Sequence, residues 1–385
     1  MEAQNYPYIR HQFSYPTMLD HWLSATNVSA KDFPKHRWAT GLQPTPHALS
    51  QIPQGAIALV GIHKESADLL RQTLYGMSWP FAHTKFFDLG NVRKSNADFL
   101  IPLLKELMEG QIFPILVGSV PNFVYAQFQA LLQIRDHISL SVIDERAGFQ
   151  LDKRSSGPDD YLHKILHQRR ESLFQLNMLG LQSHFVAPEV LNFLQQPGFD
   201  YLRLGEARDQ PEQAEPLLRD ADLLSVHLSA LKRCEAPAQR QASPSGFFLE
   251  EACRLCRYAG YSDKLRGFAL AGFDHSLSKA QQQATGQAAA QLLWYLVDGF
   301  QARVGDYPLT NKGLIEYIVD WKGHATTKLT FWKSSKSARW WLQVPANTSH
   351  KQARHRLIPC SYEDYKQSTQ GELPDRLWQA ISRFG

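Results

Sequence analysis

The sequence predicts a three-layer α/β/α domain built on a mostly parallel sheet of about eight strands. From residue 56 onward, short apolar runs alternate with segments of helical periodicity, which is the pattern of successive βαβ units. Hydrophobic residues make up 43% of the 385 residues and charged residues 20%, as in globular domains rather than disordered chains. The length is sufficient for one large α/β domain with smaller additions.

The expected elements follow one another as strand and helix in turn. A leucine-rich segment with helical spacing, residues 100–107, ends at Gly110, and the apolar run 112–117 that follows is typical of a buried strand. The expected strands are 57–62, 86–89, 112–117, 138–143, 178–181, 201–204, 223–228 and 267–271, and further helices are expected at 121–132, 248–258 and 279–299.

Two regions depart from this alternation and define the expected domain organisation. Residues 1–55 are rich in Pro, His and aromatic residues, which predicts an irregular arm with one short helix before the α/β domain of residues 56–325. In residues 326–385, two apolar runs flank the polar stretch 333–339, which predicts a β-hairpin followed by a short helix near Trp378. Adjacent strand residues point to opposite faces, so one of Trp340 and Trp341 is expected on the core and the other is available to a partner.

Charge and apolar patterning exclude several classes of function. The net charge is only +4 and the basic residues are scattered, which argues against a nucleic-acid partner. The amino terminus has neither a signal-peptide nor a transit-peptide pattern, and no stretch reaches the ~18 apolar residues of a membrane helix. We therefore expect a cytoplasmic protein without a membrane partner.

Four cysteines are too few and too unevenly spaced for a disulfide framework. Cys253 and Cys256 form a CxxC pair, which is found in redox sites and in zinc half-sites. They fall within an expected amphipathic helix, and no second Cys or His pair follows at zinc-ribbon spacing. We therefore expect both thiols to pack in the core.

Candidate functional residues follow three of the expected strands. Ligands of open α/β sheets gather at the carboxyl ends of strands, which directs attention to residues 118–122, 144–148 and 225–229. Their sequences are Gly-Ser-Val-Pro-Asn, Asp-Glu-Arg-Ala-Gly and Ser-Val-His-Leu-Ser. These segments resemble the Gly-Gly-Asp-His-Ser, Asp-Ala-His-x-Asp and Ser-x-Asp-x-Asp motifs of the arginase/ureohydrolase family.

The similarity to this family covers most of residues 56–303. The tail, with Arg339-Trp340-Trp341 and the run 359–365, resembles an extension of the formimidoylglutamase-like branch. The resemblance implies a ureohydrolase-like fold, symmetric homo-oligomers, and hydrolysis at a guanidinium or formimino carbon by water activated on two Mn²⁺ ions. It also implies a substrate-holding Glu near Ala271 and Gly272, where this chain has no carboxylate.

The positions that match the family's metal ligands are mostly filled by other residue types. Of six matched positions, only Asp144 keeps the residue of the family. At the other five, Pro121 and Arg146 each stand in place of a His, and Gly148, His227 and Ser229 each stand in place of an Asp. Arginine cannot give up its proton in a protein and repels a cation. We therefore expect no metal, or at most one held by Asp144 and His227, and Arg146 is expected to form a salt bridge with Asp144.

Each residue of this degenerate cleft is open to two interpretations. Asp144 is a metal ligand or a loop carboxylate paired with Arg146, and we favour the loop carboxylate. Glu145 is a general base or an exposed, solvated residue. Ser119 and Ser229 are nucleophiles or loop hydroxyls, and neither lies in an elbow motif.

Histidines near strand ends also have two interpretations. His227 contributes to a single-metal site or to the packing of the cleft, since two ligands rarely hold a metal. Three more, His63, His184 and His275, are expected to be hydrogen-bonded structural histidines rather than catalytic ones. The nearby Asp274 is the carboxylate nearest to the substrate-holding position.

Three functions are consistent with these residues. We favour a pseudoenzyme that has lost the dimanganese site and serves as a binding or scaffold subunit, with no cofactor and with a protein or an anionic small molecule as partner. The alternative is an Mn-dependent hydrolase of linear amidines, of the formimidoylglutamase, arginase or agmatinase type, with a rearranged metal site. In a third, weaker hypothesis, Arg146 replaces the metal as the positive centre for a bound anion.

Overall fold

The computed structural model describes residues 19–151, 157, 160–308, 312–321, 327–344 and 357–384, so the first 18 residues of the expected arm lie outside it. A ten-stranded sheet has the order β1-β4-β3-β5-β10-β9-β6-β7-β8, with β2 also paired to β4. All eight predicted strands are present: β3 (Ile57–Gly61), β4 (Phe86–Val92), β5 (Phe113–Val117), β6 (Ile138–Ile143), β7 (Leu173–Leu181), β8 (Phe199–Arg203), β9 (Leu223–His227) and β10 (Gly267–Ala271).

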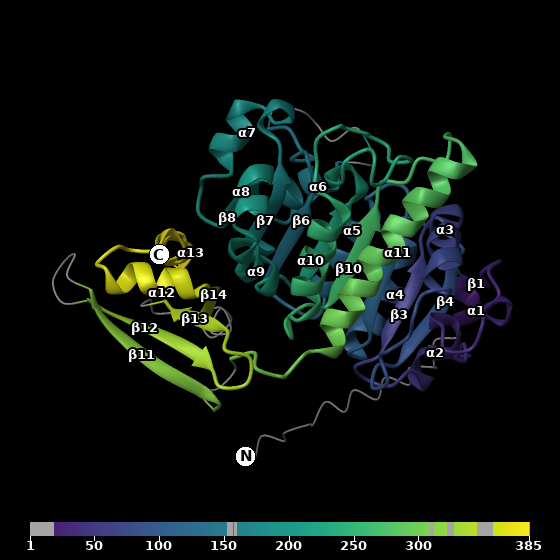
Figure 1. Cartoon of the computed structure of the whole chain (residues 1–385), viewed down its shortest axis with the longest axis horizontal. Helices are drawn as coiled ribbons and strands as arrows, with labels where there is room; N and C mark the ends of the chain where they lie inside the picture. Colours follow the sequence, from purple (N-terminus) through teal and green to yellow (C-terminus); the bar gives the residue numbers. More distant parts are fainter. Residues whose placement is uncertain are drawn as a thin grey trace, which may run out of the picture.

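These eight strands are mutually parallel, and helices cover both faces of the sheet. Successive residues of a strand face opposite layers: Ala58 and Val60 belong to one buried cluster, Ile57 and Leu59 to the other. The first cluster is covered by α4 (Ala97–Glu109), α5 (Phe123–Leu132), α6 (Tyr161–Gln168) and α7 (Pro188–Phe193). The second is covered by α3 (Lys64–Leu74), α9 (Pro211–Arg219), α10 (Leu249–Gly260) and α11 (Lys279–Gln301), the long green helix in Figure 1. The predicted α/β/α fold is confirmed.

The described part of the amino-terminal arm is more regular than the sequence indicated. Its strands β1 (Leu23–Ser24) and β2 (Leu42–Gln43) both pair with β4, and β1 runs antiparallel to it. Trp38 in α2 (Trp38–Gly41) is fully buried, with its ring centroid 5.0 Å from that of Phe86. The remaining short elements are α1 (Leu19–Trp22), α8 (Leu204–Asp209), η1 (Ala30–Asp32), η2 (Leu49–Gln51), η3 (Arg170–Ser172), η4 (Ser183–Phe185) and η5 (Leu228–Ala230).

The carboxyl-terminal part forms a second, antiparallel sheet beside the α/β body (Figure 1). The expected hairpin is present, because Trp332 pairs with Trp341 across two neighbouring strands. The sheet is larger than a hairpin and begins before residue 326; its order is β11 (Leu314–Trp321), β12 (Thr327–Ser334), β13 (Trp340–Gln343) and β14 (Leu357–Cys360). Two helices, α12 (Tyr362–Thr369) and α13 (Asp375–Phe384), complete this part.

Both tryptophans of β13 are buried, so the expectation that one is available to a partner is wrong. Trp340 stacks on Tyr365, with ring centroids 4.8 Å apart. Trp341 is 1% exposed, because the guanidinium of Arg219 on α9 lies 4.6 Å from its ring centroid. Arg219 also donates a hydrogen bond to the carbonyl oxygen of Cys360 at 3.0 Å. Arg219 therefore links the α/β body to two strands of the second sheet, and Arg339 and Arg376 add hydrogen bonds from the second part to Tyr261 and Gln213.

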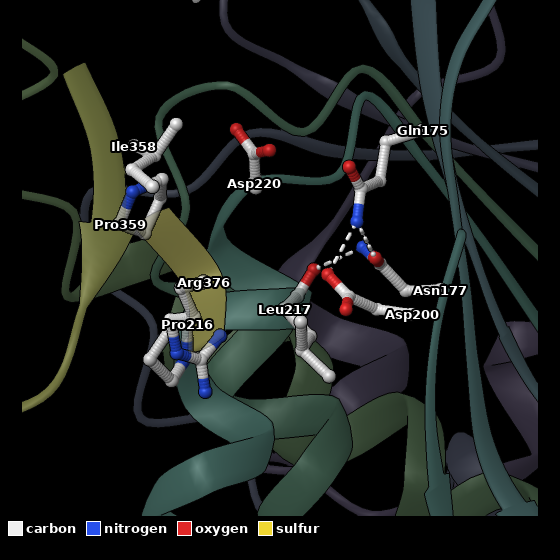
Figure 2. Close-up of a pocket in the computed structure, with 9 residues that line it drawn as sticks. All are labelled: Gln175, Asn177, Asp200, Pro216, Leu217, Asp220, Ile358, Pro359 and Arg376. Carbon is white, nitrogen blue, oxygen red and sulfur yellow. Dashed lines mark hydrogen bonds between the residues drawn. The ribbon is translucent and has the colours of Figure 1, made fainter. Parts of the chain in front are cut away.

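A small cavity of about 20 Å³ remains between these two parts (Figure 2). Gln175 and Asn177 of β7 line it from the α/β body, and Pro359 of β14 and Arg376 of α13 line it from the other side. The Gln175 amide nitrogen donates to Asn177 Oδ1 at 2.8 Å and to Asp200 Oδ2 at 2.6 Å. Polar side chains of a central strand are thus hydrogen-bonded to one another beneath the added sheet.

The four cysteines are free thiols. Cys253 and Cys256 are buried in the core under α10, at 2% and 0% exposure, which confirms the expected packing role. Within the described residues, no helix is long and apolar enough to cross a membrane.

Candidate functional site

The carboxyl ends of β6 and β9 bring three of the predicted site residues together. Since β6 and β9 are adjacent and parallel, Asp144 directly after β6 lies beside His227, the last residue of β9, and Ser229 in η5. Ser229 Oγ is 2.6 Å from Asp144 Oδ1 and 2.5 Å from His227 Nδ1. The sequence prediction that these residues meet at one edge of the sheet is therefore correct.

These two short contacts form a hydrogen-bonded chain in which the serine is the central member. Ser229 Oγ donates to Asp144 Oδ1, and His227 Nδ1 contacts the same hydroxyl. His227 Nδ1 also accepts a hydrogen bond from the backbone nitrogen of Ser229 at 3.3 Å. Ser229 is fully buried and lacks the arrangement of a catalytic triad, in which the histidine is the central member. Its hydroxyl joins two loops rather than acting as a nucleophile.

Asp144 also accepts a second hydrogen bond, from the backbone nitrogen of Arg146 at 3.4 Å. The side chain of Arg146 turns the other way, and its Nε donates to Glu145 Oε1 at 3.2 Å. The expected salt bridge between Arg146 and Asp144 is therefore wrong. Arg146 pairs with Glu145, its neighbour in the sequence, because the carboxylate of Glu145, and not that of Asp144, lies buried under the guanidinium.

Glu145 is fully buried and is not the solvated residue that the sequence suggested. Its Oε2 accepts a hydrogen bond from Gln182 Nε2 at 3.4 Å, and its carbonyl oxygen accepts one from the Gln182 backbone nitrogen at 3.0 Å. The pKa of Glu145 is raised to about 7, chiefly by burial; Arg146 opposes this rise and Asp144 adds to it. At neutral pH this carboxyl therefore exists in both protonation states.

Gly272 explains why no carboxylate occupies the position expected to hold a substrate. It follows β10 with a φ of 105°, and a Cβ placed there would lie 2.9 Å from His227 Cε1. The imidazole of His227 thus occupies the space that a side chain on residue 272 would need. Asp274 instead accepts two hydrogen bonds from Ser276, at 2.7 and 2.9 Å, and these lower its pKa.

The remaining candidate residues have local structural partners. Ser119 Oγ donates to the carbonyl oxygen of Phe273 at 2.7 Å, as expected for a loop hydroxyl. Ser66 bridges His63 Nδ1 and His275 Nε2, at 3.0 and 2.8 Å, so these two histidines are hydrogen-bonded as predicted. His184 is exposed, its ring lies 4.2 Å from that of Phe185, and its side chain has no hydrogen bond among the described residues, so the expectation of a hydrogen-bonded histidine is wrong there.

Two residues of this site were missed in the sequence. Gln182 follows β7 directly, so the rule that site residues follow parallel strands would have identified it. Phe185 lies under Arg146, with the Cζ atom 4.0 Å from the ring centroid. No sequence signal pointed to Phe185, because the contact depends on how η4 folds back beside residue 146.

The donor set does not fit two manganese ions. Hard divalent ions need several carboxylate oxygens or imidazoles that converge. Here Asp144 Oδ1 and His227 Nδ1 both contact Ser229, and Pro121, Arg146 and Gly148 provide no ligand. Across the described ranges, no group of three or more His, Cys, Asp and Glu side chains is placed to hold a metal ion.

Solved structures of a formiminoglutamase, a formimidoylglutamase and an agmatine ureohydrolase share this fold. A formiminoglutamase of Trypanosoma cruzi with Mn²⁺ matches with a TM-score of 0.58 at 14% identity, over 64% of this chain and 94% of that one. The formimidoylglutamase of Bacillus subtilis matches with a TM-score of 0.56 at 16% identity, over 77% of this chain and 97% of that one. An agmatine ureohydrolase of Thermoplasma volcanium matches with a TM-score of 0.54 at 17% identity, over 71% and 96%.

The sequence comparisons add no match: no family model fits the chain, and no curated protein is similar to it. Identities of 14 to 17% show a common architecture and leave the chemistry of the site to be argued from its own residues. The chain therefore has the ureohydrolase fold.

Proposed function

We propose that this protein belongs to the formimidoylglutamase-like branch of the ureohydrolases, that it has lost the dimanganese site, and that it acts as a non-catalytic binding or scaffold subunit. The solved structures that share its fold include enzymes of this class, among them one described with Mn²⁺. The proposal therefore rests on a contrast between a common fold and a different set of side chains.

The observation that carries the proposal is the chain from His227 through Ser229 to Asp144. It places a buried hydroxyl between the two side chains that remain capable of binding a metal, and it uses one ligand atom of each, Asp144 Oδ1 and His227 Nδ1. A metal at Asp144 Oδ1 would have to break this chain and leave a buried hydroxyl without its acceptor. Leaving a buried polar group unpaired costs about 1–3 kcal/mol.

The charge at the cleft also supports the proposal. Arg146 stands where the family has a histidine ligand, and its guanidinium remains positive at every physiological pH. Its side chain turns away from Asp144 and pairs with Glu145, and only its backbone nitrogen contacts Asp144 Oδ1, at 3.4 Å. Residue 146 therefore offers a metal no ligand, and a fixed cation next to the cleft disfavours a dication there.

The alternative function is hydrolysis of a linear amidine on a rearranged Mn²⁺ site. One observation favours it: His227 Nδ1 and Asp144 Oδ1 are 4.0 Å apart, close enough to share a ligand after Ser229 moves. The free thiols support a reducing compartment for either function, and we propose the cytoplasm.

Elemental analysis separates the two functions. The full chain is incubated with excess Mn²⁺, desalted and measured, alongside Asp144→Ala and a control, Asp274→Ala, which removes a strand-end carboxylate outside the hydrogen-bonded chain. We expect no retained manganese in any of the three proteins and no hydrolysis of formiminoglutamate, arginine or agmatine. Two equivalents of manganese in the wild type and in Asp274→Ala, but not in Asp144→Ala, would refute the proposal and support the alternative function, an Mn-dependent hydrolase.

A further inference from the structure

A cavity of about 250 Å³ opens beside the degenerate cleft, between the loop that follows β6 and helix α7. Part of its wall is apolar and includes Phe149, Val186 and Val190; Gln150 and Gln241 are polar lining residues, and Arg146 and Asp160 are charged. The volume lies below the roughly 300–1,000 Å³ typical of sites for drug-sized ligands. We call it the Arg146 pocket; its size suits a small organic molecule.

The guanidinium of Arg146 is held in one orientation at this pocket. Its Nε donates to the buried Glu145, which Gln182 holds in place, and its Cζ lies 4.0 Å above the ring of Phe185. Asp144 and Asp160 are the other ionisable groups near it.

The two terminal nitrogens of Arg146 are the unused part of this guanidinium. Among the described residues, neither has a hydrogen-bond partner, and the side chain is 38% exposed. A guanidinium with Nε occupied still presents its Nη1 and Nη2 hydrogens as a planar fork, which matches the two oxygens of a carboxylate. Because the arginine is already fixed, little conformational entropy is lost when an anion binds.

We propose that the Arg146 pocket binds a small monocarboxylate, whose two oxygens accept hydrogen bonds from the terminal nitrogens of Arg146 and whose apolar body contacts the apolar wall. This inference deepens the proposed binding role and rests on it. Asp160 lines the same pocket and disfavours dianions such as phosphate by like-charge repulsion. The apolar wall favours a carboxylate with a hydrocarbon body over acetate or formate.

The test is calorimetric titration of the full chain with benzoate and hexanoate, compared with neutral benzamide and with inorganic phosphate. We expect the two carboxylates to bind with millimolar or tighter Kd, and benzamide and phosphate to bind at least about tenfold more weakly. Arg146→Gln should weaken benzoate binding by about tenfold or more, and Arg146→Lys should weaken it less, since a lysine keeps the charge but not the fork.

Arg208 provides a matched control for these variants. Its Nε donates to Glu251 at 3.0 Å, its Cζ lies 5.0 Å from the ring centroid of Phe248, and its side chain is 34% exposed. Arg208→Gln therefore removes an arginine with the same kinds of partner but away from the pocket, and it should leave benzoate affinity unchanged. The double variant Glu145→Gln/Arg146→Gln leaves no buried unpaired charge and should lose benzoate binding even if Arg146→Gln alone folds poorly.

Equal binding of benzamide and benzoate, unchanged affinity in the double variant, or no binding of either carboxylate would overturn the inference. Manganese content measured on the same preparations separates this failure from failure of the proposed function. A chain that contains no manganese and binds neither carboxylate refutes only the inferred monocarboxylate site. A chain that retains manganese and hydrolyses an amidine refutes the non-catalytic role as well.

Discussion

Replacing Glu145 by Gln should make the free energy of unfolding higher at pH 8 while changing it little at pH 5. The folded chain raises the pKa of Glu145 from 4.5 to about 7, so it binds this proton more tightly than the unfolded chain does. The stability linked to that proton is fully present below pH 4.5 and is lost as the pH rises through 7. The wild type therefore loses about 3 kcal/mol of stability at most as the pH rises through this range. The glutamine variant does not lose it, because glutamine does not titrate.

Urea unfolding followed by tryptophan fluorescence at pH 5 and pH 8 measures the effect. The quantity to compare is the variant's free energy of unfolding minus that of the wild type at each pH. Glu251→Gln is the matched control: it also removes a carboxylate that pairs with an arginine Nε, but from a side chain that is 24% exposed. A difference for Glu145→Gln that stays constant with pH, or that falls as the pH rises, would show that Arg146 outweighs burial and would refute the reasoning.

Three further outcomes follow from the same contacts. Ser229→Ala should lower the free energy of unfolding by about 1–3 kcal/mol, because it removes a buried hydroxyl with two partners. The control Ser276→Ala removes an exposed hydroxyl that contacts Asp274 and should change the free energy of unfolding by less than about 0.5 kcal/mol. Equal effects of the two variants in urea unfolding would contradict this prediction. Gly272→Ala should lower the unfolding midpoint, since its φ of 105° and the ring of His227 exclude a side chain, and Gly205→Ala, with nothing within 4 Å, should not. Of the four thiols, only Cys234 should react rapidly with a disulfide reagent, because it is exposed. Burial raises the pKa of Cys253 to about 12, so this thiol does not form the reactive thiolate. Rapid reaction of several thiols in the native chain would contradict the prediction.

The sequence predicted the sheet well because its central strands are apolar on both faces. Runs such as 57–62 and 267–271 contain few polar residues, as expected for parallel strands that are covered by helices on both sides. Strand β7 was predicted only at 178–181, although it begins at Leu173. Gln175 and Asn177 interrupt the apolar pattern there, and their amide nitrogens donate hydrogen bonds to Asp200, Ser141 and the carbonyl oxygen of Leu217, which a pattern of hydrophobicity cannot show.

Other elements were missed for different reasons. β1 and β2 are two-residue strands, too short to give any periodicity, and they form only because β4 offers a free edge. β11 does alternate, with Tyr317 and Val319 packed into the cluster of the second sheet, so its signal was present and overlooked.

The sequence indicated part of the site, but it missed Gln182 and Phe185 and the partner of Arg146. Position at the carboxyl ends of neighbouring strands was sufficient to bring Asp144, His227 and Ser229 together. Sequence spacing could not show which carboxylate Arg146 contacts, because Asp144 and Glu145 are consecutive and leave the strand in opposite directions. Arg146 pairs with Glu145 because Glu145 is buried, and this burial depends on Gln182 and the segment after β7.

The contact between Ser229 and Asp144 also constrains how such a chain can change over evolutionary time. An aspartate introduced at 229 alone would place a second carboxylate about where a hydroxyl now lies 2.6 Å from Asp144 Oδ1, and two like charges at that distance repel strongly without a cation between them. A side chain introduced at 272 alone would meet the ring of His227. Neither substitution is therefore favourable by itself, so the present arrangement resists the gain of a carboxylate at either position one substitution at a time.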